Sequence, residues 1–220
     1  MSLQQLLFRR LAHQFGDPTG AGGHVAGWIM SHRSSNVTRS RWAVDLLDVG
    51  PGERVLELGC GPGVALAALA DRAVEGVVVG VDRSPVMIEQ ASRRNRAAVD
   101  AGRVLLACAP VEDLLPADAA GAPAPPPFDQ PFDAVLAVNN VAFWTEPIVR
   151  LAALRERMSS DGRIALVSQP RCPGADASTT AAAADELAEL LDVAGYGELK
   201  VETLDLDPPA VCVLAARTPR

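Results

Sequence analysis

Short hydrophobic runs alternate with amphipathic stretches along most of the chain, which is typical of strands separated by helices. The runs are rich in valine, leucine and alanine, and glycine, proline or charged residues bound them. Strands buried on both faces of a parallel sheet have such continuous apolar runs. The pattern predicts five buried strands, at residues 54–58, 76–82, 103–108, 132–138 and 162–168.

The segments between these runs have apolar residues at helical spacing. Ser84 and Pro85 predict the start of one helix, because serine caps helices and proline fits the first turn, and this helix is expected to continue to about residue 101. Further helical segments are expected at residues 64–70, 111–115, 147–158 and 179–194.

The last two predicted strands, at residues 199–204 and 210–215, are joined by a turn at Asp207-Pro208-Pro209. A connection this short forces an antiparallel pair. Together with the earlier strands, it predicts a doubly wound, Rossmann-like α/β sheet of seven strands. The sheet is expected to be mostly parallel, with one antiparallel strand near its edge and helices on both faces.

The beginning of the chain adds helices before the first strand. Residues 3–15 have apolar side chains at helical spacing, and a later helix is expected to start with a cap at Asn36 or Thr38 and to end at residues 50–52. We therefore expect an N-terminal helical cap at residues 1–36 and a main domain at residues 37–220. Within the main domain, residues 116–131 are rich in proline and alanine and are expected to form a surface loop.

Composition narrows the class of protein. A chain of 220 residues, 49% hydrophobic and 21% charged, is sized for one well-buried domain. The net charge of -7 argues against nucleic-acid binding, which needs a basic face. No long apolar run or secretory signal pattern is visible, so we expect a cytoplasmic protein without an integral membrane segment. A monomer and a homodimer both remain open.

Cysteine and histidine spacing argues against a metal site. The cysteines form no CxxC pair, and the histidines are not spaced as helical i, i+4 ligands. We expect reduced thiols and no metal. The residues concerned are Cys60, Cys108, Cys172, Cys212, His13, His24 and His32.

Three alternating glycines, Gly59, Gly61 and Gly63, lie between the first predicted strand and a helix. Glycine lets the backbone turn sharply and approach a ligand, and the N–H groups at a helix start can bind it. Asp82 ends the second strand, roughly 20 residues later, where an acid can accept hydrogen bonds from ribose hydroxyls. The sequence therefore predicts a nucleoside-containing cofactor at the carboxyl ends of the strands.

Two neighbours of the glycines distinguish between cofactors. Val64 is branched, whereas a dinucleotide site needs a small residue at this position for close helix packing. Glu57 is poorly placed beside a diphosphate and suits a cofactor with positive charge. Both residues favour a cationic nucleoside over NAD.

The stretches 57–63 and 81–84 together resemble those of class I S-adenosylmethionine-dependent methyltransferases of the bacterial small-molecule type. Residues 111–114 and 132–140 extend the resemblance, which covers residues 37–216. It implies methyl transfer from S-adenosylmethionine to an oxygen, nitrogen or carbon of a small, apolar acceptor, with S-adenosylhomocysteine as the product.

The resemblance also implies roles for single residues. Glu57 would hold the cationic methionine end of the cofactor, the glycines would admit it, and Asp82 would bind its ribose. Many relatives have an aspartate for the adenine amino group where Pro110 stands, so this contact passes to Glu112 or is absent. Arg83 and Met87 would flank the adenine. The backbone N–H of Val111 would reach the edge of the adenine ring, and Asn139 would lie near the transferred methyl group.

Candidates for the acceptor side are less determined. Four residues are candidates for the acceptor pocket, although core packing of the aromatics and turn formation by the asparagine are equally open. His24 and His32 are candidate general bases, but a sulfonium is an activated leaving group, so orientation and exclusion of water can suffice. The pocket candidates are Trp28, Asn140, Phe143 and Trp144.

Two other functions stay open. The first is an NAD-binding oxidoreductase, which Glu57 and Val64 disfavour. The second is a non-catalytic S-adenosylmethionine-binding protein, because no obligatory catalytic residue defines the family. Asn139-Asn140-Val141-Ala142 stands where methyltransferases of DNA bases have an Asn/Asp-Pro-Pro-Tyr/Phe segment, which makes such a substrate unexpected.

Overall fold

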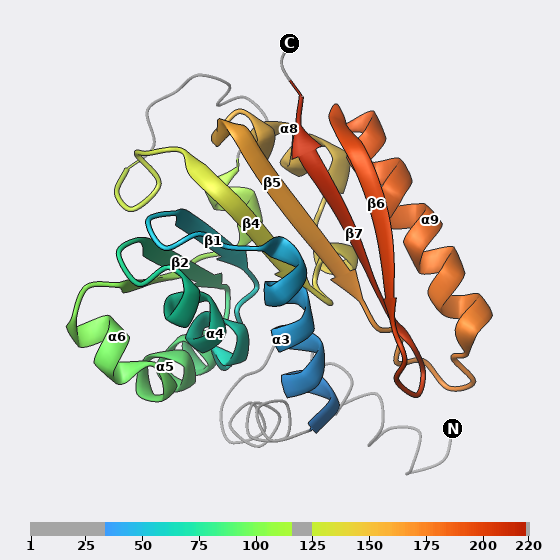
Figure 1. The fold of residues 1–220 in the computed structure, drawn as a ribbon, viewed down its shortest axis with the longest axis horizontal. Coiled ribbons are helices and arrows are strands. Elements are labelled where there is room, and N and C mark those ends of the chain that lie inside the picture. Colours follow the sequence, from blue (N-terminus) through green and yellow to red (C-terminus); the bar gives the residue numbers. More distant parts are fainter. Residues whose placement is uncertain (1–33, 116–124, 219–220) are drawn as a thin grey trace.

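A seven-stranded sheet forms the centre of the computed structural model, which describes residues 34–115 and 125–218 (Figure 1). The strand order is β3-β2-β1-β4-β5-β7-β6; neighbours from β3 to β5 are parallel, and β7 is antiparallel to both β5 and β6. The predicted fold class is confirmed. The strands are β1 (Arg54–Leu58), β2 (Val77–Asp82), β3 (Val104–Cys108), β4 (Phe132–Val138), β5 (Met158–Ser168), β6 (Tyr196–Leu204) and β7 (Ala210–Arg217).

Helices cover both faces of the sheet, because alternate residues of its strands point to opposite sides. In β1, Val55 packs with Leu47 and Leu66 of the helices on one face, whereas Leu56 packs with Leu151 of a helix on the other. Figure 1 shows α3 in front of the sheet and α9 beside β6. The helices are α3 (Ser34–Leu47), α4 (Val64–Arg72), α5 (Pro85–Arg94), α6 (Arg96–Asp100), α7 (Val111–Leu114), α8 (Pro147–Arg155), α9 (Ala177–Val193) and the 3₁₀ turn η1 (Val141–Phe143).

Several predicted boundaries differ from the structure. Asn36 and Thr38 lie inside α3 and do not cap it, and the helix expected over 84–101 is broken at Asn95 into α5 and α6. β5 begins at Met158, earlier than the predicted residue 162, because it continues beyond its apolar part into an exposed polar segment. The predicted helix at 3–15, most of the cap at 1–36 and residues 116–124 of the surface loop lie outside the described residues.

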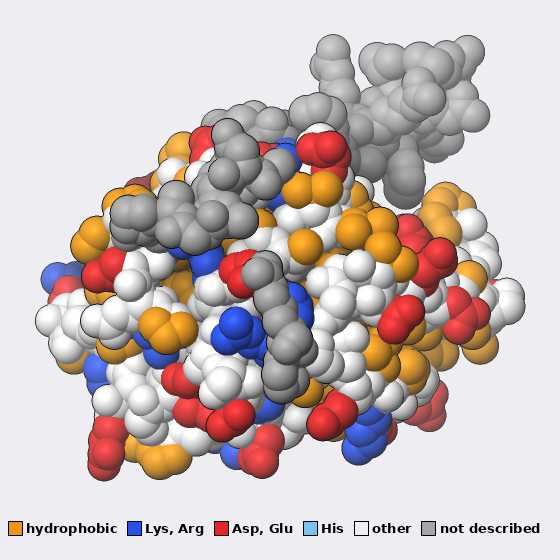
Figure 2. All heavy atoms as spheres, turned by 90° about the horizontal axis from the view of Figure 1, so that it is seen from above, with side chains coloured by type: hydrophobic (Ala, Val, Ile, Leu, Met, Phe, Trp, Pro, Cys, Tyr) orange, Lys and Arg blue, Asp and Glu red, His pale blue; other side chains and the backbone are white. Residues whose placement is uncertain are grey.

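The structure also tests the expectations about membrane segments, metal ligands, cysteines and surface charge. Within 34–115 and 125–218, no helix is long and apolar enough to cross a membrane. The same residues contain no group of three or more side chains that could hold a metal ion. All four cysteines are free; Cys60 and Cys212 are buried, whereas Cys108 and Cys172 are exposed. On the face drawn in Figure 2, acidic and basic side chains are interspersed.

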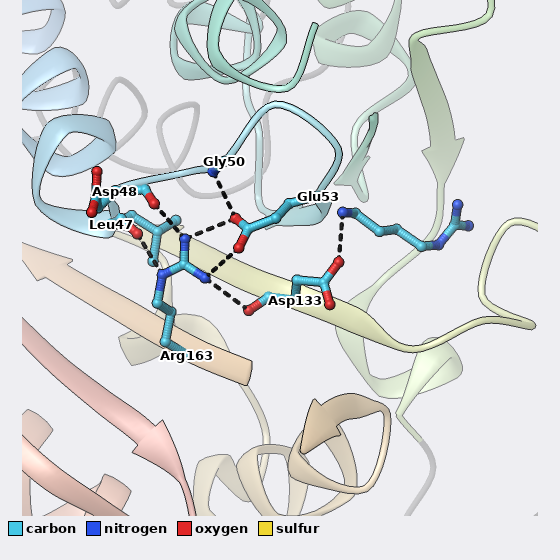
Figure 3. A network of polar contacts seen from close by, with 7 residues as sticks. Leu47, Asp48, Gly50, Glu53, Asp133 and Arg163 are labelled. Atoms are coloured by element: carbon cyan, nitrogen blue, oxygen red, sulfur yellow. Dashed lines mark hydrogen bonds and ion pairs between the residues drawn. The ribbon is translucent and has the colours of Figure 1, made fainter. Parts of the chain in front are cut away.

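Arg163, near the beginning of the apolar part of β5, joins three segments at the amino ends of the strands (Figure 3). Its guanidinium donates to the carbonyl oxygens of Leu47 and Asp48, both at 2.6 Å, at the end of α3. Two further hydrogen bonds, of 2.9 and 2.8 Å, reach the two carboxylate oxygens of Glu53, which also accepts the Gly50 N–H at 2.9 Å. The group therefore fastens α3 and the loop before β1 to the sheet.

Replacing Arg163 with methionine is expected to lower the free energy of unfolding by about 2–4 kcal/mol, because two carbonyls and a half-buried carboxylate lose their partner. The side-chain hydrogen bond from Arg163 lowers the pKa of Glu53. The part of the stabilisation that comes from the Glu53–Arg163 ion pair is therefore present above the pKa of Glu53 in the unfolded chain and disappears as the pH falls through its folded pKa, whereas the bonds to the two carbonyls do not titrate.

Urea unfolding at neutral and acidic pH measures this effect. The matched control is Arg72→Met, which removes an ion pair to Asp45 whose side chains are 47% and 61% exposed. The control is expected to lose less than about 1 kcal/mol. Equal losses in the two variants would contradict the assigned role of Arg163.

Candidate functional site

The candidate site lies at the carboxyl ends of β1, β2 and β4. Strands β1 to β3 extend the sheet in one direction and β4 and β5 in the other, so the strand order reverses between β1 and β4. Ligands of doubly wound sheets bind at this position. The chain segments that leave these strand ends are the glycine turn, Asp82 and the pair Asn139-Asn140, as predicted from the sequence.

The three glycine positions of the turn differ in how strictly the surrounding structure requires glycine. All have positive φ angles, +66° at Gly59, +52° at Gly61 and +75° at Gly63, which residues with a Cβ rarely adopt. A Cβ on Gly59 would lie 2.1 Å from Nδ2 of Asn140, and one on Gly63 would lie 2.9 Å from the Cα of Ala91. A Cβ on Gly61 would meet no atom of the described residues within 4 Å. Packing therefore requires glycine at the first and third of these positions, whereas no described residue crowds Gly61.

Asp82 holds the glycine turn against the end of β2. One carboxylate oxygen accepts the Gly61 N–H at 2.8 Å and the other accepts the Ser84 N–H at 2.9 Å. The Cys60 N–H donates to the carbonyl of Val81 at 2.8 Å. Through these two hydrogen bonds the carboxylate of Asp82 fixes the glycine turn at the carboxyl end of β2.

Glu57 is a carboxyl group buried inside the site. Its side chain comes from β1, the residue is 3% exposed, and Oε2 has no hydrogen-bond partner among the described residues. Burial, and secondarily the negative charge of Asp82, raises the pKa of Glu57 to about 8. An ionised carboxylate is unfavourable in such surroundings unless a cation accompanies it. The site therefore suits a positively charged ligand.

Asn139 and Asn140 connect β4 to its two neighbours. The side-chain amide of Asn140 donates to the carbonyl of Leu58 in β1, and its Oδ1 is buried without a partner in the part of the chain that the structure describes. Asn139 has a φ of 55°, and its Oδ1 accepts the N–H of Gln169, after β5, at 2.7 Å. Both side chains thus fix the relative positions of the strand ends.

Gln169 and Arg39 also lie near the carboxyl ends of the strands and were not identified as site residues from the sequence. Oε1 of Gln169, which is 3% exposed, accepts from Arg39 of α3 at 2.6 Å and from Arg171 at 2.8 Å. Its amide nitrogen donates to the carbonyl of Pro208 at 2.7 Å. The position of Gln169 directly after the fifth strand is the one signal that could have indicated it, because the other site residues also follow strand ends.

The residues expected around the adenine differ in exposure. Met87 and Val111 are 1% and 8% exposed, and Arg83 is exposed. Glu112 accepts the Thr145 N–H at 2.8 Å. Burial opposes ionisation of Glu112, but the hydrogen bond from Thr145 helps to leave its pKa below the usual value. Glu112 thus holds the loop between η1 and α8, and its contact with adenine stays a prediction.

The residues expected at the acceptor are only partly described. Phe143 is 57% exposed on η1, whereas Trp144 is 9% exposed and packs in the hydrophobic core. His24, His32 and Trp28 fall in residues 1–33, for which no structure is described. The roles of all five in binding or catalysis stay predictions.

Comparison with known proteins agrees on one activity. A family model described as a methyltransferase domain matches residues 55–162. The chain is 25% identical over 194 residues to the uncharacterized methyltransferase YdaC of Bacillus subtilis (strain 168), covering 88% of this chain and 98% of that protein. It is 32% identical over 129 residues to the aklanonic acid methyltransferase DauC of Streptomyces sp. (strain C5), covering 58% of this chain and 53% of DauC.

Solved structures show the same fold. The crystal structure of a SAM-dependent methyltransferase from Aquifex aeolicus superposes with a TM-score of 0.66 at 16% identity, covering 89% of this chain and 98% of that one. At this identity the likeness concerns the fold, whereas the family model and the relatives in sequence concern the activity.

A doubly wound sheet with a glycine turn and two carboxyl groups at the reversal of strand order defines an α/β protein that binds a nucleoside cofactor. Within that class, the chain belongs to the class I S-adenosylmethionine-dependent methyltransferases. S-adenosylmethionine is its cofactor, and the residues present fit this molecule. The buried oxygen of Glu57 has no partner among the described residues and suits the cationic methionine end, and the open side of Gly61 leaves room for a ligand.

Proposed function

We propose that this methyltransferase acts on an oxygen, nitrogen or carbon atom of a small, apolar acceptor. The observation that carries the proposal is Phe143, an aromatic side chain 57% exposed shortly after the carboxyl end of β4. An aromatic side chain exposed on the segment that follows β4 offers an apolar contact surface for an acceptor. DauC, a relative over about half of its own length, is named for aklanonic acid, which also supports a small acceptor.

The roles of the cofactor-side residues follow from their chemistry. When bound, S-adenosylmethionine supplies a methyl group on a sulfonium, which is an activated leaving group. Glu57 would hold the ammonium of the methionine end as an ion pair, and Asp82 would accept hydrogen bonds from the ribose. The three glycines would let the backbone approach the cofactor, whereas Met87 is 1% exposed, so its contact with the adenine stays a prediction.

The residues at the ends of β4 and β5 would orient the acceptor. Asn139 is held by Gln169, which Arg39 in turn fixes from α3. These bonds support a role for Asn139 as a fixed group that would lie near the transferred methyl. Alignment of acceptor and methyl in a water-poor site supplies much of the rate of such a transfer. No general base is placed among the described residues, and His24 and His32 stay candidates for that role.

Formation of S-adenosylhomocysteine with a panel of aromatic acids, phenols, amines and a DNA duplex tests the proposal. Turnover is expected with small apolar acceptors, and methylation of the duplex alone would contradict it. Binding of the cofactor without any turnover would favour the non-catalytic alternative.

Replacing Phe143 with serine is expected to raise the acceptor KM about 5- to 20-fold, because apolar contact area is lost, and to leave the cofactor Kd unchanged. The matched control is Val193→Ser, which removes an apolar side chain of similar exposure, 58%, at the end of α9. An unchanged acceptor KM in the Phe143 variant would contradict the assigned contact.

A further inference from the structure

Asn95 lies between α5 and α6, where the sequence pattern predicts one continuous helix. The residue is 6% exposed. Its backbone N–H donates to the Ala91 carbonyl at 3.0 Å, and its own carbonyl accepts from Ala98 and Val99. Local helix geometry thus satisfies its main chain, and the side chain is available for other contacts.

The side chain of Asn95 makes one local and one distant hydrogen bond. Nδ2 donates to the carbonyl of Ala91 at 2.9 Å and to the carbonyl of Gly63 at 3.1 Å, across 32 residues of sequence. The amide uses both of its N–H groups in this way. A buried donor with two partners is geometrically well determined, so Asn95 joins α5 to the glycine turn.

Gly63 is the residue at which the glycine turn becomes α4. It is the N-cap of α4 in a left-handed conformation, and no side chain caps the helix there. The Gly63 N–H donates to the Cys60 carbonyl at 3.0 Å, and its carbonyl accepts from Asn95. Because the peptide unit is planar and trans, a fixed Gly63 carbonyl also fixes the N–H of Val64 in the opposite direction.

We propose that Asn95 is a positioning residue for cofactor binding, because it fixes the Gly63 peptide and with it the first N–H groups of α4. These N–H groups and the positive end of the helix dipole are the parts of α4 that can contact the cofactor. The inference rests on cofactor binding at the glycine turn, as in the function proposed above. Asn95 itself acts through Gly63.

Titration calorimetry of the full chain with S-adenosylhomocysteine tests the inference. Asn95→Ala is expected to raise the Kd about tenfold, the effect of losing one positioning hydrogen bond. The matched control is Arg103→Met, because Arg103 donates to the Ala70 carbonyl, near the other end of α4, at 2.9 Å. The control is expected to lower Tm to a similar extent and to leave the Kd within about twofold of the wild type.

A second variant keeps the size of the side chain. In Asn95→Asp, an ionised carboxylate would face two carbonyl oxygens, and protonation would restore one O–H donor. At this position, which is 6% exposed, burial is expected to raise the pKa of the new carboxyl. The ratio of its Kd to that of the wild type is therefore expected to decrease as the pH is lowered from about 8 to about 5.5, whereas the ratio for Asn95→Ala stays constant.

The outcomes separate the two levels of the account. A lower Tm with an unchanged Kd in both Asn95 variants would overturn the inference and leave Asn95 as a helix-breaking structural residue. An equal loss of affinity in Arg103→Met would also overturn it. If the wild type bound S-adenosylhomocysteine but methylated no acceptor, the proposed function would fail, and the Kd values would still decide the role of Asn95.

Discussion

Replacing Glu57 with glutamine is expected to weaken binding of S-adenosylmethionine about 100-fold and to remove much of the pH dependence of stability. The affinity falls because a buried, charge-assisted contact to the methionine ammonium is lost. The neutral amide keeps the shape of the side chain but has no charge to offer. Calorimetry with the wild type and the variant measures the change in Kd.

The pH dependence has a defined sign. The pKa of Glu57 is raised by burial and by Asp82, from 4.5 to about 8. Between these values the unfolded chain has released the proton and the folded chain has kept it, so stability of the cofactor-free protein falls as the pH rises. The slope approaches about 1.4 kcal/mol per pH unit and ends above the folded pKa.

Cofactor affinity should follow the opposite course. The cation favours ionised Glu57, so the wild-type Kd is expected to decrease as the pH rises toward about 8. The variant is expected to show neither trend. Urea unfolding and calorimetry across this range measure both, with the exposed Glu75→Gln as the control. Parallel pH profiles for the wild type and Glu57→Gln would contradict the assignment of Glu57.

Alanine substitutions at Gly61 and Gly63 are expected to differ most in their effect on folding. Gly63→Ala should lower the free energy of unfolding by about 2–4 kcal/mol, because its positive φ is strained and its Cβ would lie 2.5 Å from Nδ2 of Asn95 and 2.9 Å from the Cα of Ala91. Gly61→Ala should lower it by only about 1–2 kcal/mol, since its Cβ meets no atom of residues 34–115 and 125–218 within 4 Å. The same Cβ points into the space beside the turn and should weaken cofactor binding at least about tenfold.

Gly102 provides the matched control for Gly61. It has a φ of +70°, and an added Cβ would likewise meet no atom within 4 Å in the described part of the chain, but Gly102 lies in the turn before β3, at the amino ends of the strands. Gly102→Ala should therefore lower the free energy of unfolding about as much as Gly61→Ala does, and it should leave the Kd for the cofactor unchanged. Wild-type affinity in Gly61→Ala would show that the cofactor does not lie against this turn.

Local patterns explain which parts of the fold could be predicted. Strand β4 was predicted at its observed bounds, because a strand buried on both faces is apolar along nearly all of its length; Asp133 is the one charged residue in β4. The break between α5 and α6 was missed, since the helical pattern continues through Asn95. The break coincides with a side-chain contact to Gly63, which no local pattern reveals.

The candidate site follows the same division. Glu57, the glycines and Asp82 stand at strand ends within short motifs, so their chemistry and spacing are visible in the sequence. Gln169 and Arg39 meet across 130 residues, and their contact depends on how α3 packs beside β5. The hydrogen bond from the Thr145 N–H to Glu112 is likewise a tertiary contact between segments far apart in the sequence.

Titration of the wild-type chain with S-adenosylmethionine, S-adenosylhomocysteine and NAD decides which cofactor the glycine turn binds. We expect the first two to bind, more tightly at pH values near 8 than at lower pH, and NAD not to bind measurably. Tight binding of NAD without binding of S-adenosylmethionine would contradict this expectation.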